Sequence, residues 1–282
     1  MEKRDLKKLS GSADKKQRSK KLKIYLGLLV IVTLIALIVF SIWWCRGKFF
    51  TKNPRFALRR IELRTMSSGY WKGRESAMWR RLGLKEGTNL FSLDLRDIRK
   101  KLLCISNLSN AEVEVVLPDT LKIDLTERVP RAFLGNLNSP WVLDDKCVLV
   151  PRSETIATRL DLPIITGFRD RNKKYYSGTE LESARSAMAL IMTVNQYFPK
   201  IKVMLVERIA TGNPVNDKLV VWIKYFEQND CCLYLPAMAD RNTYYNKLLE
   251  FENAIEKARR NGENGKYFNL LFRGKVFIKE KP

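Results

Sequence analysis

The chain has 282 residues, with 52 Lys or Arg, 30 Asp or Glu and no His, so its formal net charge is +22. The lack of histidine excludes a Ser-His-Asp triad, a Cys-His pair and any histidine-ligated metal. The apolar share of 45% is too high for a disordered protein, and the charge surplus indicates an anionic partner or surface, such as nucleic acid, phospholipid headgroups or acidic cell-envelope polymer.

The first element is an uninterrupted apolar run over residues 24–44, IYLGLLVIVTLIALIVFSIWW. A helix of about 20 apolar residues crosses a bilayer core about 30 Å thick, and Trp43 and Trp44 end the run as indole rings do at a membrane–water interface. A cleaved signal peptide would have an apolar region of only about 7–15 residues, followed by small residues. A buried core helix of this length would show a polar face. We therefore predict an uncleaved, single-pass signal anchor.

Basic residues flank the predicted anchor on both sides. The tail over residues 1–23 holds ten Lys or Arg against three Asp or Glu. A short polar tail before a first membrane helix usually stays in the cytoplasm, so we expect everything after Arg46 to lie outside the cytoplasmic (inner) membrane. Basic residues beside a membrane most often contact anionic lipid headgroups. The predicted membrane-interface residues are Lys20, Lys21, Lys23, Trp43, Trp44 and Arg46. Nucleic-acid binding by the tail is the alternative, and we do not favour it.

A compact α+β unit is predicted over residues 56–128, after a short basic connector over 45–55. Its clearest signal is a hairpin, in which two runs (111–115 and 121–125) alternate apolar and polar residues around a Pro118-Asp119 turn. The expected order is a strand (56–64), a helix (74–82), a helix capped by Ser92 or Asp94, and the two strands of the hairpin. Two helices would then cover one face of a three-stranded sheet.

The rest of the chain, residues 129–282, is predicted to form a mostly antiparallel sheet flanked by helices. One helix is expected after the capping box Thr179–Glu182, and another from Asp240–Thr243 to Asn261-Gly262. The final element is expected to be one strand over residues 268–279. The other expected strands are Arg131–Leu134, Trp141–Leu143, Cys147–Val150, Lys202–Glu207, Lys218–Tyr225 and Cys231–Leu235.

We predict no catalytic residue, no cofactor site and no metal site. Asp144 and Asp145 are adjacent carboxylates, which is typical of a solvated turn. The sequence has no Gly-rich phosphate loop and no nucleophile motif. The five cysteines form no CxxC pair and are expected to be small buried apolar residues: Cys45, Cys104, Cys147, Cys231 and Cys232. An enzyme is therefore not expected.

The ordered motifs of the chain resemble those of the FtsQ/DivIB family of bacterial cell-division proteins. That family has a short cytoplasmic tail, one membrane helix, a polypeptide-transport-associated (POTRA) domain and a β domain. The resemblance implies a POTRA domain over residues 56–128, a β domain over 129–282, and a location at the division septum. The matching motifs are FALRRIEL (56–63), GTNLFSLD (87–94), AEV (111–113), LPDTLKI (117–123), TERVPRA (126–132), WVLD (141–144) and LPIITG (162–167).

The resemblance implies a non-enzymatic scaffold that links other membrane division proteins, notably small single-pass coiled-coil proteins. A physical route is β-augmentation, in which a partner segment adds to an exposed edge strand. The candidate edge is the terminal strand, with the predicted partner-binding residues Phe272, Arg273, Gly274, Lys275, Val276 and Phe277. The competing interpretation is that Phe272 and Val276, at even spacing, simply face the core.

Two other functions remain open at this point. POTRA domains also occur in chaperones of envelope protein assembly and secretion, which would require a transmembrane β-barrel after the domain. A charge-driven lipid or cell-wall anchor would use the net charge of +15 that follows the tail, from 42 Lys or Arg against 27 Asp or Glu. Binding by such an anchor should weaken steeply with salt, whereas an added strand should not be released by salt.

Overall fold

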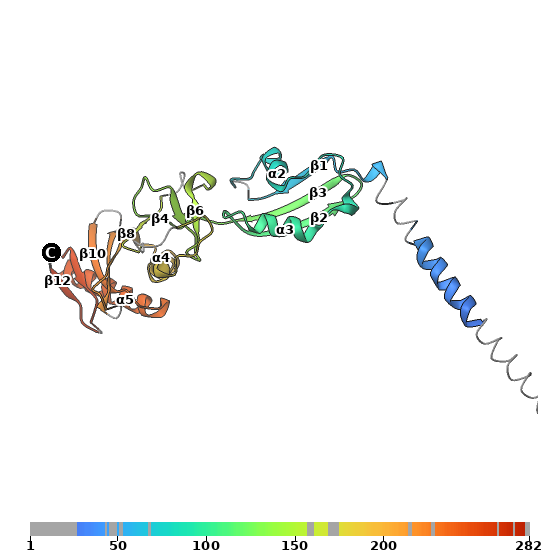
Figure 1. The fold of residues 1–282 in the computed structure, drawn as a ribbon. Helices are drawn as coiled ribbons and strands as arrows, with labels where there is room; N and C mark the ends of the chain where they lie inside the picture. Colours follow the sequence, from blue (N-terminus) through green and yellow to red (C-terminus); the bar gives the residue numbers. More distant parts are fainter. Residues whose placement is uncertain are drawn as a thin grey trace, which may run out of the picture. The chain divides into compact units, whose positions relative to one another are not determined.

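Two separate β-sheets organise the chain, as the computed structural model in Figure 1 shows. One sheet has three strands and the other has nine. The structure describes residues 27–42, 44, 50, 53–66, 69–156, 161–168, 175–213, 216–226, 229–263, 265–272 and 274–279. Helices accompany both sheets, so the predicted α+β class is confirmed.

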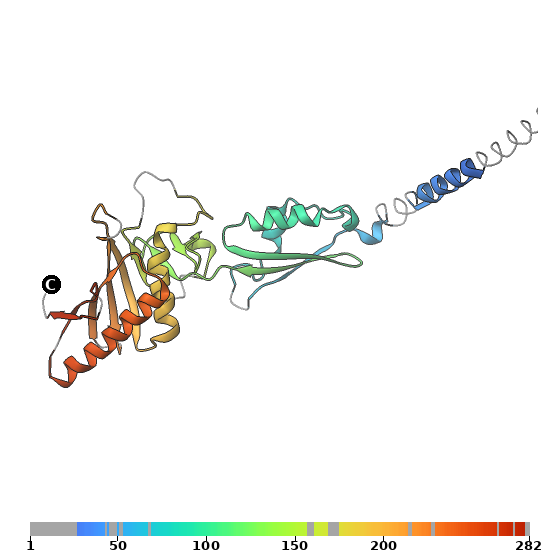
Figure 2. The ribbon, with the colours of Figure 1, turned by 90° about the horizontal axis from the view of Figure 1, so that it is seen from below.

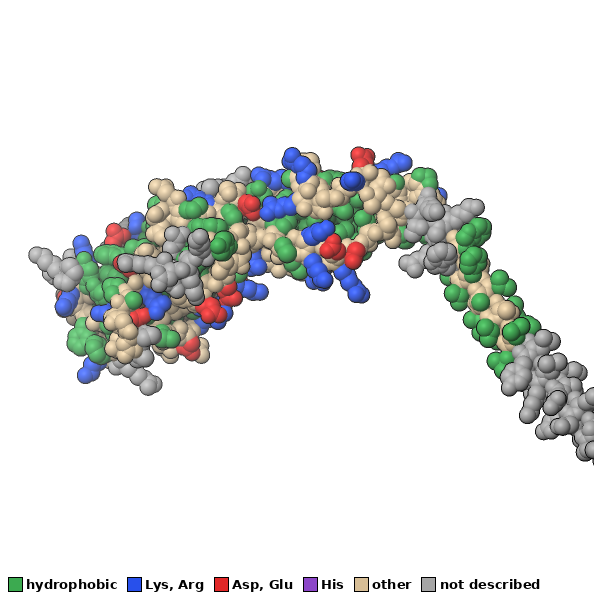
Figure 3. Space-filling model, in the orientation of Figure 1, with side chains coloured by type: hydrophobic (Ala, Val, Ile, Leu, Met, Phe, Trp, Pro, Cys, Tyr) green, Lys and Arg blue, Asp and Glu red, His purple; other side chains and the backbone are tan. Residues whose placement is uncertain are grey.

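Residues 27–42 form a helix with exposed apolar side chains. Leu37 and Ile42 are 63% and 64% exposed, and hydrophobic side chains cover this helix in Figure 3. Among the residues described here, no helix combines the length and the apolar character needed to cross a bilayer. The predicted span is longer than this helix, because residues 24–26 and 43 lie outside the described residues.

The three-stranded sheet has the order β1-β3-β2. Its central strand, β3, is the last of the three along the sequence. Apolar alternation places Leu121, Ile123 and Leu125 of the central strand in the core, where each is at most 6% exposed. The predicted sequence of strand, helix, helix, strand and strand is confirmed. The elements are β1 (Arg60–Arg64), α2 (Glu75–Leu82), α3 (Leu95–Leu103), β2 (Leu108–Val116) and β3 (Thr120–Glu127), with short 3₁₀ helices η2 (Pro54–Phe56) and η3 (Leu90–Ser92).

The first strand begins four residues later than predicted. The side chain of Asn53 accepts a hydrogen bond from the Arg55 amide at 3.0 Å and caps η2. Residues 54–56 therefore turn instead of extending, and Pro54 suits the first position of such a turn because it lacks an amide hydrogen.

The nine-stranded sheet has the order β12-β11-β10-β9-β8-β7-β4-β5-β6. Five of its strand pairs are antiparallel and three are parallel, so the prediction of a mostly antiparallel sheet is confirmed. The strands are β4 (Ala132–Leu134), β5 (Trp141–Leu143), β6 (Leu149–Pro151), β7 (Ile164–Thr166), β8 (Ile201–Ile209), β9 (Lys218–Tyr225), β10 (Asn229–Pro236), β11 (Tyr267–Asn269) and β12 (Phe277–Lys279).

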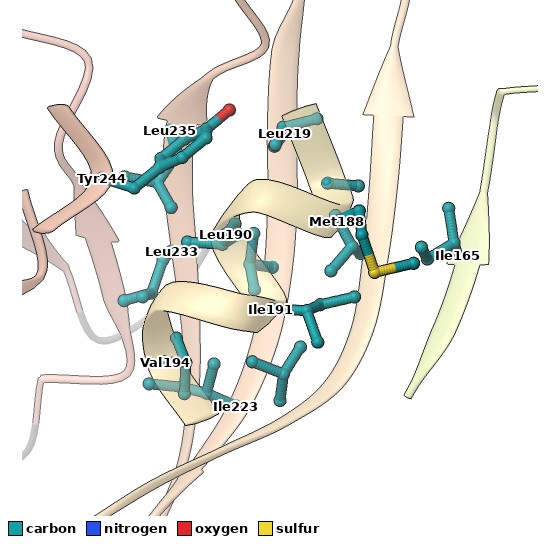
Figure 4. Close-up of a cluster of buried hydrophobic side chains, with 14 of the residues drawn as sticks. Ile165, Met188, Leu190, Ile191, Val194, Leu219, Ile223, Leu233, Leu235 and Tyr244 are labelled. Carbon is teal, nitrogen blue, oxygen red and sulfur yellow. The ribbon is translucent and has the colours of Figure 1, made fainter. Parts of the chain in front are cut away.

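Two helices, α4 (Arg185–Tyr197) and α5 (Arg241–Arg260), contribute to the main core of this sheet. Figure 4 shows Met188, Ile191 and Val194 of α4 directed toward the sheet. They meet apolar side chains of the strands, each at most 1% exposed: Ile165, Leu219, Ile223, Leu233 and Leu235. Burial of each such side chain stabilises the fold by about 1.5–3 kcal/mol.

The sequence signals of α5 are confirmed, whereas the capping box proposed for α4 is wrong. Asp240 caps α5 by accepting a hydrogen bond from the Thr243 amide at 2.8 Å, and Asn261 ends the helix. In contrast, α4 begins at Arg185 and lacks a side-chain cap. The backbone of Thr179 instead accepts a hydrogen bond from the Leu149 amide at 2.8 Å. Thr179 therefore pairs with β6, and it lies too far from the first residue of α4 to cap this helix.

The prediction of one continuous terminal strand is also wrong. The region forms two short strands, β11 and β12, which pair antiparallel. The side chain of Asn269 accepts a hydrogen bond from the Leu271 amide at 3.1 Å, a local turn that ends β11. Gly274 has a φ of +66°, which reverses the chain before β12. Residues 270–276 are thus a connection, which we call the β11–β12 connection.

Candidate partner-binding site

The two edges of the nine-stranded sheet are β6 and β12. The chain covers the β6 edge itself, because Gly178 donates to the Leu149 carbonyl and Leu149 donates to the Thr179 carbonyl, both at 2.8 Å. Across the described part of the chain, no strand pairs with the outer side of β12. An unpaired edge offers main-chain donors and acceptors to another chain. The β12 edge is therefore the candidate site for strand addition.

The side chains of β12 divide between the core and an outer surface. Ile278 lies opposite Phe268, which is fully buried, and Ile278 packs against the core. The neighbouring residues Phe277 and Lys279 therefore lie on the outer face, since side chains alternate along a strand. Phe277 is 51% exposed there. A partner strand beside β12 would meet this phenylalanine.

A pocket of about 440 Å³ opens on the outer face beside β12. The rings of Phe272 and Phe277 meet edge to face at 5.8 Å between centroids. Of the described residues that line the pocket, two are lysines and none is acidic. Such a lining suits an apolar anchor side chain with acidic neighbours. The lining residues are Lys218, Tyr234, Tyr267, Asn269, Leu271, Phe272, Phe277 and Lys279.

A buried lysine holds the β11–β12 connection against α5. Lys247 is 7% exposed. Its Nζ donates to the Phe272 carbonyl oxygen at 2.6 Å and pairs with the Glu250 carboxylate at 3.0 Å. Without the ammonium group, the Phe272 carbonyl would lose this bond. Lys247 thus fixes the segment that carries one wall of the pocket.

Sequence reasoning missed Lys247, although a signal for it exists. The apolar stripe of α5 includes Tyr244, Leu248 and Phe251. Lys247 lies three residues after the first of these and four before the last, so it falls on the buried stripe. A lone lysine on such a stripe is a buried charge that requires a partner.

The structure separates the predicted partner-binding residues into different roles. Phe272 and Phe277 line the pocket, but only Phe277 lies on β12. Val276 packs against the core, so the core-facing interpretation is correct for Val276 and wrong for Phe272, which is 56% exposed. Gly274 and Lys275 are exposed in the β11–β12 connection. Arg273 lies outside the described residues.

The predicted membrane-interface residues fall almost entirely outside the described part of the chain. Trp44 is described: it is helical and 56% exposed. The others, Lys20, Lys21, Lys23, Trp43 and Arg46, lie outside the described residues. The interface assignment thus stays a prediction.

Comparison with known proteins identifies the first folded region. The family described as "POTRA domain, FtsQ-type" matches residues 77–128. The chain is 33% identical over 112 residues to the Cell division protein FtsQ of Geobacter sp. (strain M21), and the match covers 40% of each chain. Residues 77–128 therefore form an FtsQ-type POTRA domain, and the chain is similar to FtsQ cell division proteins over part of its length.

Further relatives in the FtsQ/DivIB family match shorter or more divergent segments. The Cell division protein FtsQ of Syntrophotalea carbinolica is 35% identical over 81 residues, 29% of this chain and 28% of that protein. The protein of the same name from Myxococcus fulvus is 29% identical over 140 residues, 49% of this chain and 46% of that protein. The chain thus matches less than half the length of each of these relatives.

One motif of the FtsQ/DivIB resemblance, TERVPRA (126–132), has a clear structural role. Glu127 ends β3, and its carboxylate accepts hydrogen bonds from the Thr65 hydroxyl and the Tyr70 amide, both at 2.6 Å, and from the Trp71 amide at 3.0 Å. The next residue, Arg128, donates to the Asp144 carboxylate at 2.6 Å. Glu127 thus binds the segment after β1, whereas Arg128 binds the residue that follows β5.

The prediction of a solvated turn is wrong for Asp144, which is 1% exposed. Besides Arg128, its carboxylate accepts hydrogen bonds from the Val148 amide at 2.7 Å and the Lys146 amide at 3.0 Å. Asp145 is exposed, as expected. The first carboxylate of the pair therefore organises the β5–β6 turn.

The described cysteines are free, and burial controls their chemistry. Burial raises the pKa of the Cys231 and Cys232 thiols to about 11 and that of Cys147 to about 12. These groups are neutral thiols at pH 7, which are poor nucleophiles and metal ligands. Cys104 is exposed, contrary to the expectation of burial, and Cys45 lies outside the described residues.

Proposed function

We propose that this protein is a non-enzymatic, membrane-anchored scaffold of the bacterial division complex that captures other division proteins at the β12 edge. The observation that carries the proposal is the edge strand β12, which no strand among the described residues covers and which lies beside an aromatic and basic pocket. Small single-pass coiled-coil proteins are the proposed partners, which is the class that the FtsQ/DivIB resemblance implies. The similarity to FtsQ cell division proteins supports the role in division.

Capture would combine main-chain pairing with side-chain recognition. A partner segment that pairs with β12 extends the sheet and gains hydrogen bonds that do not depend on its sequence. An apolar partner side chain would enter the pocket between Phe272 and Phe277. Acidic residues next to it would meet Lys218 and Lys279. Specificity would then come from the pocket, whereas the edge supplies general affinity.

The proposed anchor is the apolar segment over residues 24–44, with the tail over residues 1–23 in the cytoplasm and the folded regions outside. The exposed apolar helix at 27–42 supports the anchor, because such a surface needs a lipid or protein cover. Anionic headgroups would contact the basic residues around the anchor. In this topology both sheets would be available to partners at the septum.

The test is affinity capture of the tagged full-length protein from gently solubilised membranes, with the co-purifying proteins identified. Phe277→Glu should lower recovery of single-pass coiled-coil proteins about tenfold, a loss of about 1.4 kcal/mol in binding free energy. Tyr197→Glu is the matched control, because Tyr197 at the end of α4 is similarly exposed, at 55% against 51%. Capture by the control should equal that of the wild type.

Other results would favour the competing functions. Undiminished recovery with Phe277→Glu would remove the β12 assignment. A β-barrel or a secreted substrate among the captured proteins would favour the POTRA-bearing chaperone. An eluate without partners would favour a charge-driven anchor, whose binding to anionic vesicles should decline steeply with salt.

A further inference from the structure

Exposed apolar side chains gather at one end of the three-stranded sheet. The rings of Phe50, Phe56 and Phe91 form a cluster with centroid separations of 6.2, 5.3 and 5.0 Å. Phe50 and Phe91 are 45% and 41% exposed. The β2–β3 turn adds Val116 and Leu117, which are 41% and 54% exposed. We call these five residues the apolar end.

Hydrogen bonds join the segments that carry the apolar end. The Asn89 side chain donates to the Phe50 carbonyl at 2.9 Å and to the Asn53 carbonyl at 3.3 Å. Its oxygen accepts from the Phe91 amide at 2.9 Å. The Arg59 amide also donates to the Asp119 carbonyl at 2.9 Å, which brings in the β2–β3 turn. Figures 1 and 2 show this turn at the end of the sheet where the chain enters β1.

Arginines accompany the apolar end. Arg55 and Arg59 are exposed, and within the part of the chain that the structure describes their guanidinium groups have no carboxylate at salt-bridge distance. Arg60, in contrast, pairs with Asp119 at 3.1 Å. Exposed aromatic rings beside cationic side chains are typical of surfaces that lie in the headgroup region of a membrane. The charge favours anionic lipids.

The chain length between the predicted anchor and the apolar end limits where this surface can lie. Five residues separate Trp44 from Phe50. Even fully extended, they span roughly 20 Å at about 3.3–3.6 Å per residue. If Trp44 lies at the membrane interface, Phe50 can reach the headgroup layer without any rearrangement of the folded segments.

We propose that the apolar end is a second membrane contact, which rests in the headgroup layer of an anionic bilayer. Asn89 acts as a positioning residue, since it holds the incoming chain at Phe50 and Asn53 while it also supports Phe91. The contact would set the height of the first folded domain above the membrane. This inference rests on the proposed membrane anchor over residues 24–44.

Site-directed spin labelling of the full chain in vesicles tests the proposal. Val116→Cys carries the label at the apolar end, and Leu103→Cys, at the C-terminus of α3, is the matched control, because the two residues are 41% and 44% exposed. Both are made with Cys45→Ser and Cys104→Ser. In vesicles containing phosphatidylglycerol, the Val116 label should collide several times more often with oxygen than with a water-soluble nickel chelate. The Leu103 label should favour the chelate.

A third label at Leu34→Cys separates failure of the anchor from failure of this contact. If Leu34 is lipid-inserted while the Val116 label behaves like the Leu103 label, the apolar end does not touch the membrane. If Leu34 is itself in water, both the anchor and this contact are wrong. Shielding of the Val116 label from both collision partners would mean that protein, not lipid, covers the surface.

Two further variants test which groups make the contact. Phe91→Ser should shift the Val116 label toward the chelate, and so should Asn89→Ala, because each loosens the cluster. Replacement of phosphatidylglycerol by phosphatidylcholine should also shift the Val116 label toward the chelate if Arg55 and Arg59 contribute to the contact. An unchanged label in all three experiments would contradict the proposal.

Discussion

The two edges of the nine-stranded sheet are strands of equal length with different surroundings. β6 and β12 each have three residues. Residues 178–180 cover β6 through main-chain hydrogen bonds and a bridge between Val148 and Glu180. On the other side, β12 ends the sheet, and the nearby pocket exposes two phenylalanines. Whether an edge can receive a partner thus depends on the neighbouring segments of the same chain rather than on the strand itself.

Among the substitutions proposed here, loss of Asp144 should destabilise the protein most. This residue organises the turn that leads into β6, the covered edge. Asp144→Ala should destabilise the protein by about 3–5 kcal/mol, because it leaves the Arg128 guanidinium without its buried partner. Asp145→Ala, at the exposed neighbour, should change stability by no more than about 0.5 kcal/mol. Urea unfolding of the full chain in detergent measures both. Equal effects of the two substitutions would show that the turn does not depend on the buried pair.

At the open edge, replacement of Lys247 should lower both stability and partner capture. Its effect on stability should be smaller than that of Asp144→Ala. Lys247→Met keeps the length of the side chain but leaves the Phe272 carbonyl without its donor, at a cost of about 1–3 kcal/mol. Partner capture should fall as well, because the wall of the pocket at Phe272 is no longer held. Lys257→Met, on the last turn of α5, is the control. If Lys247→Met captured partners as well as the wild type does, Lys247 would not be needed for the candidate site.

Asp217 lies next to β9, an interior strand of the nine-stranded sheet, and its contribution to stability should depend on pH. Hydrogen bonds from the Thr211 amide and the Arg208 guanidinium lower the pKa of Asp217, which precedes β9. A lowered pKa in the folded state stabilises the protein above the unfolded value of about 4. This contribution disappears as the pH falls through the folded-state pKa.

The test of Asp217 compares the wild type with Asp217→Asn in urea unfolding at neutral and acidic pH. The wild type should be the more stable of the two at pH 7, and the difference should shrink below a pH of about 4. A difference that stays constant over this range would show that the carboxylate charge does not matter.

The smallest effect should come from the lysines of the pocket. Lys279→Glu should weaken capture of an acidic partner by less than about 1 kcal/mol, because exposed charges contribute little and are screened by salt. The association rate and its salt dependence should change more than the dissociation rate. Surface plasmon resonance with a captured coiled-coil partner separates these rates. A dominant effect on dissociation would place this lysine inside the bound core.

Most elements could be predicted from the sequence because they follow local periodicity. The hairpin at 111–125 alternates strictly, and α5 carries both a capping residue and an apolar stripe. Expected and observed bounds agree fully for β5 and β9. Such signals are local, since the apolar or polar character of each residue indicates whether its side chain is buried.

Two of the errors have a different cause, because each involved a residue whose partner is distant in the sequence. Thr179 has the spacing of a capping box, but its backbone pairs with β6 instead. Asp144 resembles a solvated turn residue until Arg128 is placed beside it. For the candidate site, the sequence predicted the terminal segment as the partner-binding region, with Phe277 among its residues. It could not assign Val276 to the core and Phe272 to the pocket.

The apolar segment at 24–44, the basic charge and the order of most helices and strands can be derived from the sequence alone. These depend on composition and on periods of two or 3.6 residues, which need no knowledge of neighbours. Which edge of the nine-stranded sheet is covered, which groups pair with Lys247 and where Asn89 holds the incoming chain became visible in the tertiary structure alone. Those features arise from contacts between distant segments, and a hydrogen bond between such segments has no periodic trace in the sequence.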